Sequence, residues 1–214
     1  MLDHGCEVLD VHHHVGDAFT ALGGDLDPRG GMSAAEYDRV ELESRLGIMD
    51  AGLAGISFHT RFQGVSLDSR WITAAVERLA GRGTVPIVHA MDETPEESLW
   101  KLAALARAVP DTPILTLDPF CSFEATRQCF FLAELAPNII FDTSLSYNFD
   151  FIEDFVRRFG AERVAFGTDL YSWPVGKRVS HLLAQIVESK LAHRDKALIL
   201  GGNARTLFGL DGGV

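Results

Sequence analysis

Two histidines spaced one residue apart, His12 and His14, stand at the end of an apolar run near the start of the chain. The run Val8–Val11 is typical of a buried strand, which we expect over residues 6–12, and Gly16 follows where the chain must turn. Side chains alternate between the two faces of a strand, so the two histidines would point to the same side. Two imidazoles at one strand end supply half of the ligands that a divalent metal ion needs.

Further histidines and carboxylates follow other short apolar runs, either directly or, for Asp169, after two residues. These residues, each with the run before it, are His59 (54–58), His89 (85–88), Asp118 (113–117) and Asp169 (163–166). The carboxyl ends of parallel strands meet at one edge of a sheet, where α/β proteins place their sites. Neutral imidazoles with one carboxylate suit Zn²⁺, and also Mn²⁺ or Fe²⁺. The sequence therefore predicts a divalent metal site at this edge.

Short β-branched runs alternate with longer segments whose apolar residues recur every three or four positions. We expect strands at 6–12, 54–58, 85–88, 113–117, 138–142 and 163–166. We expect helices at 34–51, 71–79, 95–108, 124–135 and 150–159. Strands that are apolar almost throughout are typical of a parallel sheet covered on both faces. The alternation predicts one α/β domain over residues 1–214, with its sheet either closed as a barrel or doubly wound.

The composition is that of an ordinary globular protein and narrows the range of partners. The 214 residues are 47% hydrophobic and 23% charged, with a formal net charge of −11. Such a charge disfavours nucleic acid and anionic membranes as partners, and no apolar run reaches the ~18 residues that cross a bilayer. Three scattered cysteines do not make a disulfide framework, and no secretory segment is recognisable. We therefore expect a cytoplasmic protein that acts on a small molecule.

Three segments of the sequence resemble one protein family. They are DVHHH with its following glycine at 10–16, GAERVAFGTD at 160–169 and ILGGNARTLFGL at 199–210. In that order they resemble the opening strand, the eighth strand and the closing helix of the amidohydrolase superfamily. The similarity is to the branch that holds aminocarboxymuconate-semialdehyde decarboxylase, γ-resorcylate decarboxylase and related metal-dependent hydrolases. It implies a parallel (β/α) barrel of the TIM type.

The resemblance also implies a set of ligands for one metal ion. His12 and His14 match the paired histidines of the first strand, and His89 resembles the histidine ligand of the fifth strand. Asp169 matches the aspartate of the eighth strand. Two features depart from the family: Asp118 stands where the sixth strand usually ends in a histidine, and about six strands are readable where eight are expected. We therefore expect a shortened or distorted barrel.

The leading expectation for function is a metal-dependent hydrolase. It would act on a small carboxylate, ester, lactone or amide through a water molecule activated by Zn²⁺ or another divalent ion such as Mn²⁺. Asp169 would accept the proton of that water, and Asp118 or His59 would replace the missing histidine in proton transfer. Two alternatives stay open. One is a metal-dependent, non-oxidative decarboxylase of an aromatic or unsaturated acid, and the other is a degenerate barrel used for binding.

Three further residues are candidates for contact with the substrate. Arg61 follows His59 closely, and a guanidinium group can hold a carboxylate through two hydrogen bonds. Tyr171 and Trp173 follow Asp169 and are expected to line the pocket. The aromatic pair at 130–131, in an expected helix, is a candidate contact of a homodimer.

Overall fold

A parallel sheet of five strands forms the centre of the computed structural model, which describes residues 5–17, 54–91, 94–173 and 179–210, with the backbone alone at 14–17 and 172–173. The strands, in their order in the sheet, are β2 (Gly55–Phe58), β3 (Val85–His89), β4 (Ile114–Leu117), β5 (Ile139–Asp142) and β6 (Val164–Ala165). Their order in space is their order in the sequence, so each strand pairs with the next one along the chain. All of these carboxyl ends therefore lie at one edge.

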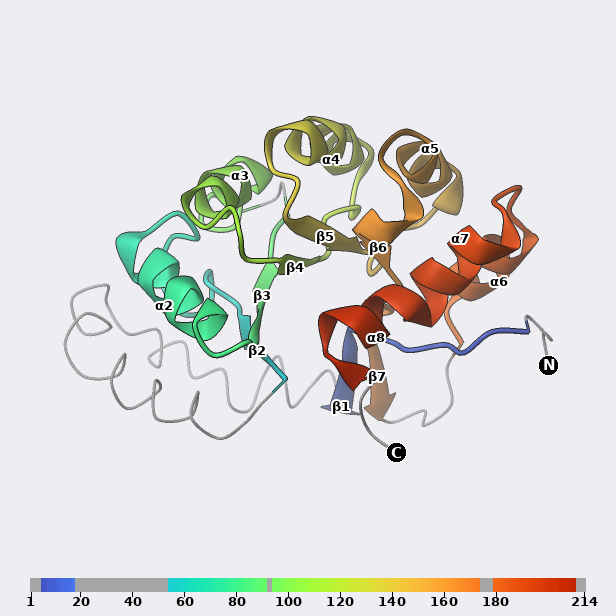
Figure 1. Cartoon of the computed structure of the whole chain (residues 1–214), viewed down its shortest axis with the longest axis horizontal. Helices are drawn as coiled ribbons and strands as arrows, with labels where there is room; N and C mark the ends of the chain where they lie inside the picture. Colours follow the sequence, from blue (N-terminus) through green and yellow to red (C-terminus); the bar gives the residue numbers. More distant parts are fainter. Residues whose placement is uncertain (1–4, 18–53, 92–93, 174–178, 211–214) are drawn as a thin grey trace.

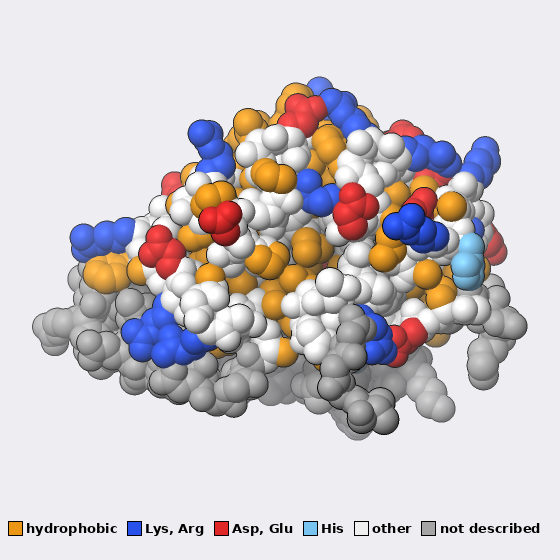
Figure 2. Space-filling model, viewed as in Figure 1, with side chains coloured by type: hydrophobic (Ala, Val, Ile, Leu, Met, Phe, Trp, Pro, Cys, Tyr) orange, Lys and Arg blue, Asp and Glu red, His pale blue; other side chains and the backbone are white. Residues whose placement is uncertain are grey.

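A helix lies between each pair of successive strands, and in Figure 1 these helices form an arc outside the sheet. They are α2 (Arg70–Ala80), α3 (Leu99–Ala108), α4 (Phe123–Leu135) and α5 (Phe149–Phe159). The side chains of Ser69, Ser122 and Asn148 accept backbone N–H groups in the first turns of α2, α4 and α5. Such N-caps satisfy donors that have no partner within the helix. On the face seen in Figure 2, acidic and basic side chains are interspersed over these helices.

A second sheet contains only β1 (His13–Asp17) and β7 (Leu170–Trp173), which pair in parallel. The segment before β1 joins this pair to the main sheet, because the Val11 N–H donates to the Phe166 carbonyl at 3.0 Å. The Leu9 N–H donates to the Leu200 carbonyl at 2.8 Å. The segment before β1 is thus held by residues that follow β6, more than 150 positions later in the sequence.

The C-terminal part of the chain is a series of short helical segments. They are the 3₁₀ turn η2 (Ala161–Arg163), α6 (His181–Glu188), α7 (His193–Ala197), the π-helix η3 (Leu198–Gly202) and α8 (Asn203–Leu207). The Asn203 amide donates to the carbonyls of Ala161 and Val164, both at 2.7 Å, and so fixes α8 against the start of β6. An ideal Cβ on Gly201 would lie 2.9 Å from the Glu7 carbonyl, so this glycine permits close contact with the N-terminal segment.

Both faces of the five-stranded sheet are covered by apolar side chains. The larger cluster lies between the sheet and the outer helices and includes Phe120, Phe141 and Phe155, all fully buried. The smaller cluster, on the opposite face, contains Val85, Leu115, Leu117 and Ala165, with Leu207 and Phe208 of the C-terminal segment packed against it. Burial on both faces explains why the strands read as nearly unbroken apolar runs.

The expected α/β fold with a shortened or distorted barrel is confirmed. In the described part of the chain, five parallel strands alternate with helices, and no strand pairing closes the sheet into a barrel. The expected strand at 6–12 is wrong: the strand begins at His13, and residues up to His12 form irregular hydrogen bonds instead. The expected helix at 95–108 begins only at Leu99. The strand β7 was not expected, and the helix expected at 34–51 lies outside the described residues.

Candidate metal centre

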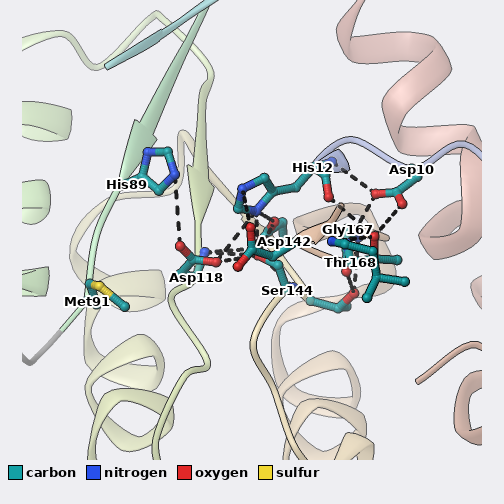
Figure 3. Close-up of polar contacts among 12 residues, drawn as sticks. Asp10, His12, His89, Met91, Asp118, Asp142, Ser144, Gly167 and Thr168 are labelled. Carbon is teal, nitrogen blue, oxygen red and sulfur yellow. Dashed lines mark hydrogen bonds and ion pairs between the residues drawn. The ribbon is translucent and has the colours of Figure 1, made fainter. Parts of the chain in front are cut away.

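A cluster of polar side chains gathers where β3, β4 and β5 end, beside the segment that leads into β1 (Figure 3). His12, His89 and Asp118 each offer one ligand atom, and these three atoms lie within 4.8 Å of one another. All three residues are buried, with exposed fractions of 5–6%. Two imidazoles and one carboxylate form a set of donors that divalent metal ions bind.

His12 lies at the centre of this cluster. Its Nδ1 is 2.9 Å from the Ser144 hydroxyl oxygen and 3.2 Å from Asp142 Oδ2. The same nitrogen is 3.5 Å from Asp118 Oδ1. On the other edge of the ring, Nε2 is 3.4 Å from Asp169 Oδ1. One imidazole is therefore surrounded by three carboxylates, which come from the ends of three different strands.

Asp142 and Ser144 hold Asp118 in place. Asp142 is fully buried, and its Oδ1 accepts the backbone N–H groups of Asp118 at 2.9 Å and of Ser144 at 3.3 Å. The Ser144 hydroxyl lies within hydrogen-bond distance of Asp118 Oδ1 and of Asp142 Oδ2, and its single hydrogen can serve one of them at a time. The two side chains thus fix the position of the Asp118 carboxylate.

The pKa values in the cluster reflect the high density of negative charge. Burial alone would lower the pKa of His12, but the hydrogen bond to Asp142 and the charges of Asp142, Asp118 and Asp169 raise it to about 9. Burial and the neighbouring Asp142 charge raise the pKa of Asp118 to about 7. Both shifts mean that added positive charge is favoured here, whether it arrives as a proton or as a cation.

The backbone of Asp118 and Asp169 adopts a conformation that is rare for residues with a side chain. Their φ angles are +64° and +51°, in the left-handed region. This conformation costs a residue other than glycine roughly 1–2 kcal/mol, although aspartate tolerates it better than most. Both residues leave a strand end at this point and carry a carboxylate of the cluster. Such strain is common at functional sites, where the surrounding structure enforces it.

Gly167 lies beside the cluster at a position where a side chain has no room. An ideal Cβ at this position would lie 2.5 Å from Asp142 Oδ2 and 3.1 Å from His12 Cβ. Thr143 holds this glycine, because the Thr143 hydroxyl donates to the Gly167 carbonyl at 2.8 Å. The absence of a side chain at Gly167 therefore allows Asp142 and His12 to meet.

Asp10 links the segment that carries His12 to the segment that carries Asp169. The Asp10 carboxylate accepts the His12 N–H at 3.1 Å, the Thr168 N–H at 3.1 Å and the Thr168 hydroxyl at 2.6 Å. In addition, the Asp169 N–H donates to the His12 carbonyl at 2.7 Å. Burial raises the pKa of Asp10, while these hydrogen bonds act in the opposite direction. This network sets the distance between His12 and Asp169.

The residues of the cluster fit a divalent cation. Three carboxylates with side-chain exposures of 0–21% converge on His12, and such a concentration of buried negative charge is unfavourable without a compensating cation. His89 Nε2 lies 3.9 Å from Asp118 Oδ2, leaving this pair close enough to share one ion. The set of donors does not discriminate Zn²⁺ from Mn²⁺, because imidazole and carboxylate serve both.

Three other predicted site residues, His59, Arg61 and Tyr171, lie around this cluster. The His59 ring stacks on the His89 ring, with centroids 3.9 Å apart, and Arg61 follows two residues later. Burial and the charges of Asp169 and Asp118 raise the pKa of Tyr171, so its hydroxyl lies within the field of the cluster. The side chains of His14 and Trp173 lie outside the described part of the structure.

Three residues of the site were not predicted from the sequence. Asp142 lies within the expected strand at 138–142, and neither Asp142 nor Ser144 was given a role. Glu97 was hidden inside the expected helix at 95–108, although it is fully buried and its Oε1 lies 2.8 Å from His59 Nδ1. A carboxylate at the very end of an apolar strand could have indicated Asp142. Nothing in the local sequence indicates Glu97.

The fold and the cluster together define a metal-binding α/β protein with its site at the carboxyl ends of parallel strands. The family model named Amidohydrolase (Amidohydro_2) matches residues 21–210 of the sequence. The chain therefore belongs to the amidohydrolase family. The resemblance inferred from the sequence motifs is confirmed. No curated protein sequence matches the chain significantly.

Several solved structures share the fold. An uncharacterised TIM-barrel protein from Bordetella bronchiseptica is 17% identical with a TM-score of 0.62, over 78% of this chain and 61% of that one. This chain thus spans about three fifths of the length of that protein. Amidohydrolase 2 from Bifidobacterium longum is 18% identical with a TM-score of 0.61, over 96% of this chain and 100% of that one. These two chains therefore match over nearly their full lengths.

Two further similar structures are decarboxylases. The 2,6-dihydroxybenzoate decarboxylase from Rhizobium is 18% identical with a TM-score of 0.54, over 87% of this chain and 69% of that one. The 5-carboxyvanillate decarboxylase from Novosphingobium aromaticivorans, solved with bound manganese, is 14% identical with a TM-score of 0.57, over 78% and 60% of the two chains. Among the described helices of the present chain, none has the length and apolar character needed to cross a bilayer.

Proposed function

We propose that the protein is a metal-dependent, non-oxidative decarboxylase of a small aromatic or unsaturated carboxylic acid. The observation that carries the proposal is the buried group of His12, His89 and Asp118, with Asp169 at its edge. The similarity in fold to two decarboxylases supports this reaction over the hydrolysis that the sequence first suggested. We expect the enzyme to work in the cytoplasm as a single domain, with Mn²⁺ or Zn²⁺ as its ion.

His12, His89 and Asp118 would hold the ion, and Asp142 and Ser144 would keep Asp118 in position. When bound, the ion would supply positive charge that orients the acid and stabilises the negative charge that develops on it as carbon dioxide leaves. The residues around it exclude water, since His12, His89 and Asp118 are all buried. A water-poor site strengthens each electrostatic contact with the acid.

Asp169 is the residue best placed to move a proton. Its side chain is 21% exposed, more than that of Asp118 or Asp142, so it lies on the open side of the cluster. In the reaction, the bond between the carboxylate and its carbon breaks, carbon dioxide leaves, and the electron pair stays on the carbon. A proton held at an Asp169 oxygen then forms the new C–H bond, and water returns a proton to Asp169.

The test is to supply the metal-free protein with Mn²⁺ or Zn²⁺ and incubate it with 2,6-dihydroxybenzoate and other hydroxybenzoates in D₂O. Release of carbon dioxide, with one deuterium in the product where the carboxylate was, is the expected result. Hydrolysis of a panel of esters, lactones and amides without loss of carbon dioxide would overturn the proposal in favour of a hydrolase. No turnover of either panel by protein that binds one ion would favour a binding role.

Three variants separate the roles of the carboxylates. Asp118→Asn is expected to lose the ion, as measured by elemental analysis after gel filtration. The resemblance implied Asp169 as a ligand, whereas the present proposal makes it a proton donor. Asp169→Asn is therefore expected to retain the ion and to lose at least a hundredfold in kcat, because proton transfer contributes about 10²–10⁴-fold. Asp111→Asn removes an exposed carboxylate and is the matched control, with no change expected in either measurement.

A further inference from the structure

Glu97 is a fully buried carboxylate that lies outside the metal cluster. It is in the turn that precedes α3, and the backbone of this turn is fixed, because the Met91 N–H donates to the Glu97 carbonyl at 2.9 Å. A buried carboxylate is costly unless charged or hydrogen-bonding groups surround it. Its partners therefore indicate why this residue is tolerated in the protein interior.

The partners of Glu97 are three consecutive residues that follow β2. Oε1 accepts the Arg61 backbone N–H at 3.1 Å and lies 2.8 Å from His59 Nδ1 and 3.5 Å from the Thr60 hydroxyl. Oε2 lies 3.6 Å from Arg61 Nε. One carboxylate thus sets both the path of the backbone after β2 and the orientation of two cationic or polar side chains.

The contact with Glu97 determines which edge of the His59 ring faces away. The ring is stacked on His89 on one side, with an interplanar angle of 8°, and meets the Phe62 ring at 4.2 Å. With Nδ1 directed at Glu97, Nε2 is the polar atom left on the opposite edge of the ring. The His59 side chain is 29% exposed, so it lies at the border between the buried metal cluster and solvent.

Arg61 is held beside it in a similar way. Its Nε faces Glu97, its Nη1 lies 3.4 Å from the Met91 sulfur, and its side chain is 31% exposed. Met91 follows His89 by two residues, on the segment that leaves β3 (Figure 3). A thioether is a weak acceptor, so a carboxylate that approached this guanidinium would readily replace it.

We propose that Arg61 and His59, positioned by Glu97, form the subsite that binds a carboxylate group of the substrate next to the metal cluster. Arg61 offers its Nη edge and His59 its Nε2 edge, and Glu97 fixes both by binding the opposite edges. This inference rests on the proposed function, because it assigns a place to the acid group of a small carboxylic acid. Glu97 acts here as a positioning residue and does not touch the substrate.

The test compares two probes that differ by the carboxylate alone, 2-hydroxybenzoate and phenol, bound to the metal-loaded full-length protein and measured by calorimetry. Arg61→Met is expected to weaken 2-hydroxybenzoate about tenfold or more, the size of one charge-assisted hydrogen bond, and phenol less than twofold. His59→Phe keeps a ring for stacking but removes both nitrogens, and it is expected to give the same contrast.

Glu97→Gln is expected to lower the affinity for 2-hydroxybenzoate selectively, because an amide cannot accept from both neighbours as the carboxylate does. Combined with Arg61→Met it should cause little further loss of affinity, since both changes disrupt the same carboxylate subsite. Glu96→Gln, at the adjacent and less buried glutamate, is the matched control. Metal content is measured in every variant, and Arg61→Met keeps the comparison valid if Glu97→Gln does not fold.

Equal weakening of both probes, or no change in either, would overturn this inference. The outcome is independent of turnover. A contrast between the probes in a protein that releases no carbon dioxide would reject the proposed decarboxylase and retain the carboxylate subsite. Decarboxylation without the contrast would reject the subsite alone.

Discussion

Gly167→Ala is the substitution whose effect follows most directly from the geometry of the cluster. The added Cβ would lie 2.5 Å from Asp142 Oδ2, and ordinary contact begins near 3.4 Å, so Asp142 or the backbone must move by about 0.9 Å. Metal sites tolerate errors in ligand position of only about 0.2 Å. Because Asp142 holds both His12 and Asp118, we expect the affinity for Mn²⁺ to fall about 10–100-fold. Overpacking should also lower the free energy of unfolding by roughly 1–3 kcal/mol.

The measurements are metal titration by calorimetry and urea unfolding of the metal-free protein. Gly81→Ala is the matched control: Gly81 has right-handed helical angles, and its added Cβ would lie 3.7 Å from the nearest carbonyl oxygens. That variant should bind Mn²⁺ normally and be as stable as the native chain or up to about 1 kcal/mol more stable. Wild-type affinity together with wild-type stability for Gly167→Ala would refute the close contact around Asp142.

Three further outcomes follow from contacts described above. Asn203→Ala should lower the free energy of unfolding by about 2–4 kcal/mol, because it leaves two buried carbonyls without a donor, and urea denaturation measures this. Thr168→Val removes the hydroxyl that donates to Asp10 and should weaken metal binding severalfold with a smaller loss of stability; unchanged affinity would mean that Asp10 does not position His12. Chelation should lower the melting temperature. Mn²⁺ at about 100 times its Kd should then raise the free energy of unfolding by about 2.7 kcal/mol. A melting temperature that changes neither with chelator nor with added Mn²⁺ would argue against an ion between His12 and Asp118.

The sequence predicted the parallel α/β architecture because the strands β3, β4 and β5 are covered on both faces and read as apolar runs. It also predicted that His89 and Asp118 lie together, since each directly follows such a run. The predicted position of the first strand, residues 6–12, was wrong because the strand begins at His13, just after the predicted strand ends. Periodicity cannot show this, as a polar residue in a strand end looks like its boundary.

The remaining parts of the site depend on contacts between distant segments. Glu97 reaches His59 across 38 positions, and Asp142 reaches His12 across 130. No local pattern encodes such distances. The left-handed backbone of Asp118 and Asp169 cannot be predicted from the sequence either, because aspartate is common in ordinary loops. These residues are found only when the strands are in place.

The attachment of residues 9–12 to Phe166 and Leu200 has a consequence for biosynthesis. A ribosome adds about 5–20 residues per second, so residues 9–12 are made well before those two partners. At that rate Phe166 is added roughly 8–30 seconds after Val11, and the hydrogen bond between them can form only after that delay. His12 would therefore reach the position in which it can share an ion with Asp118 only after Phe166 has been made and has joined the main sheet.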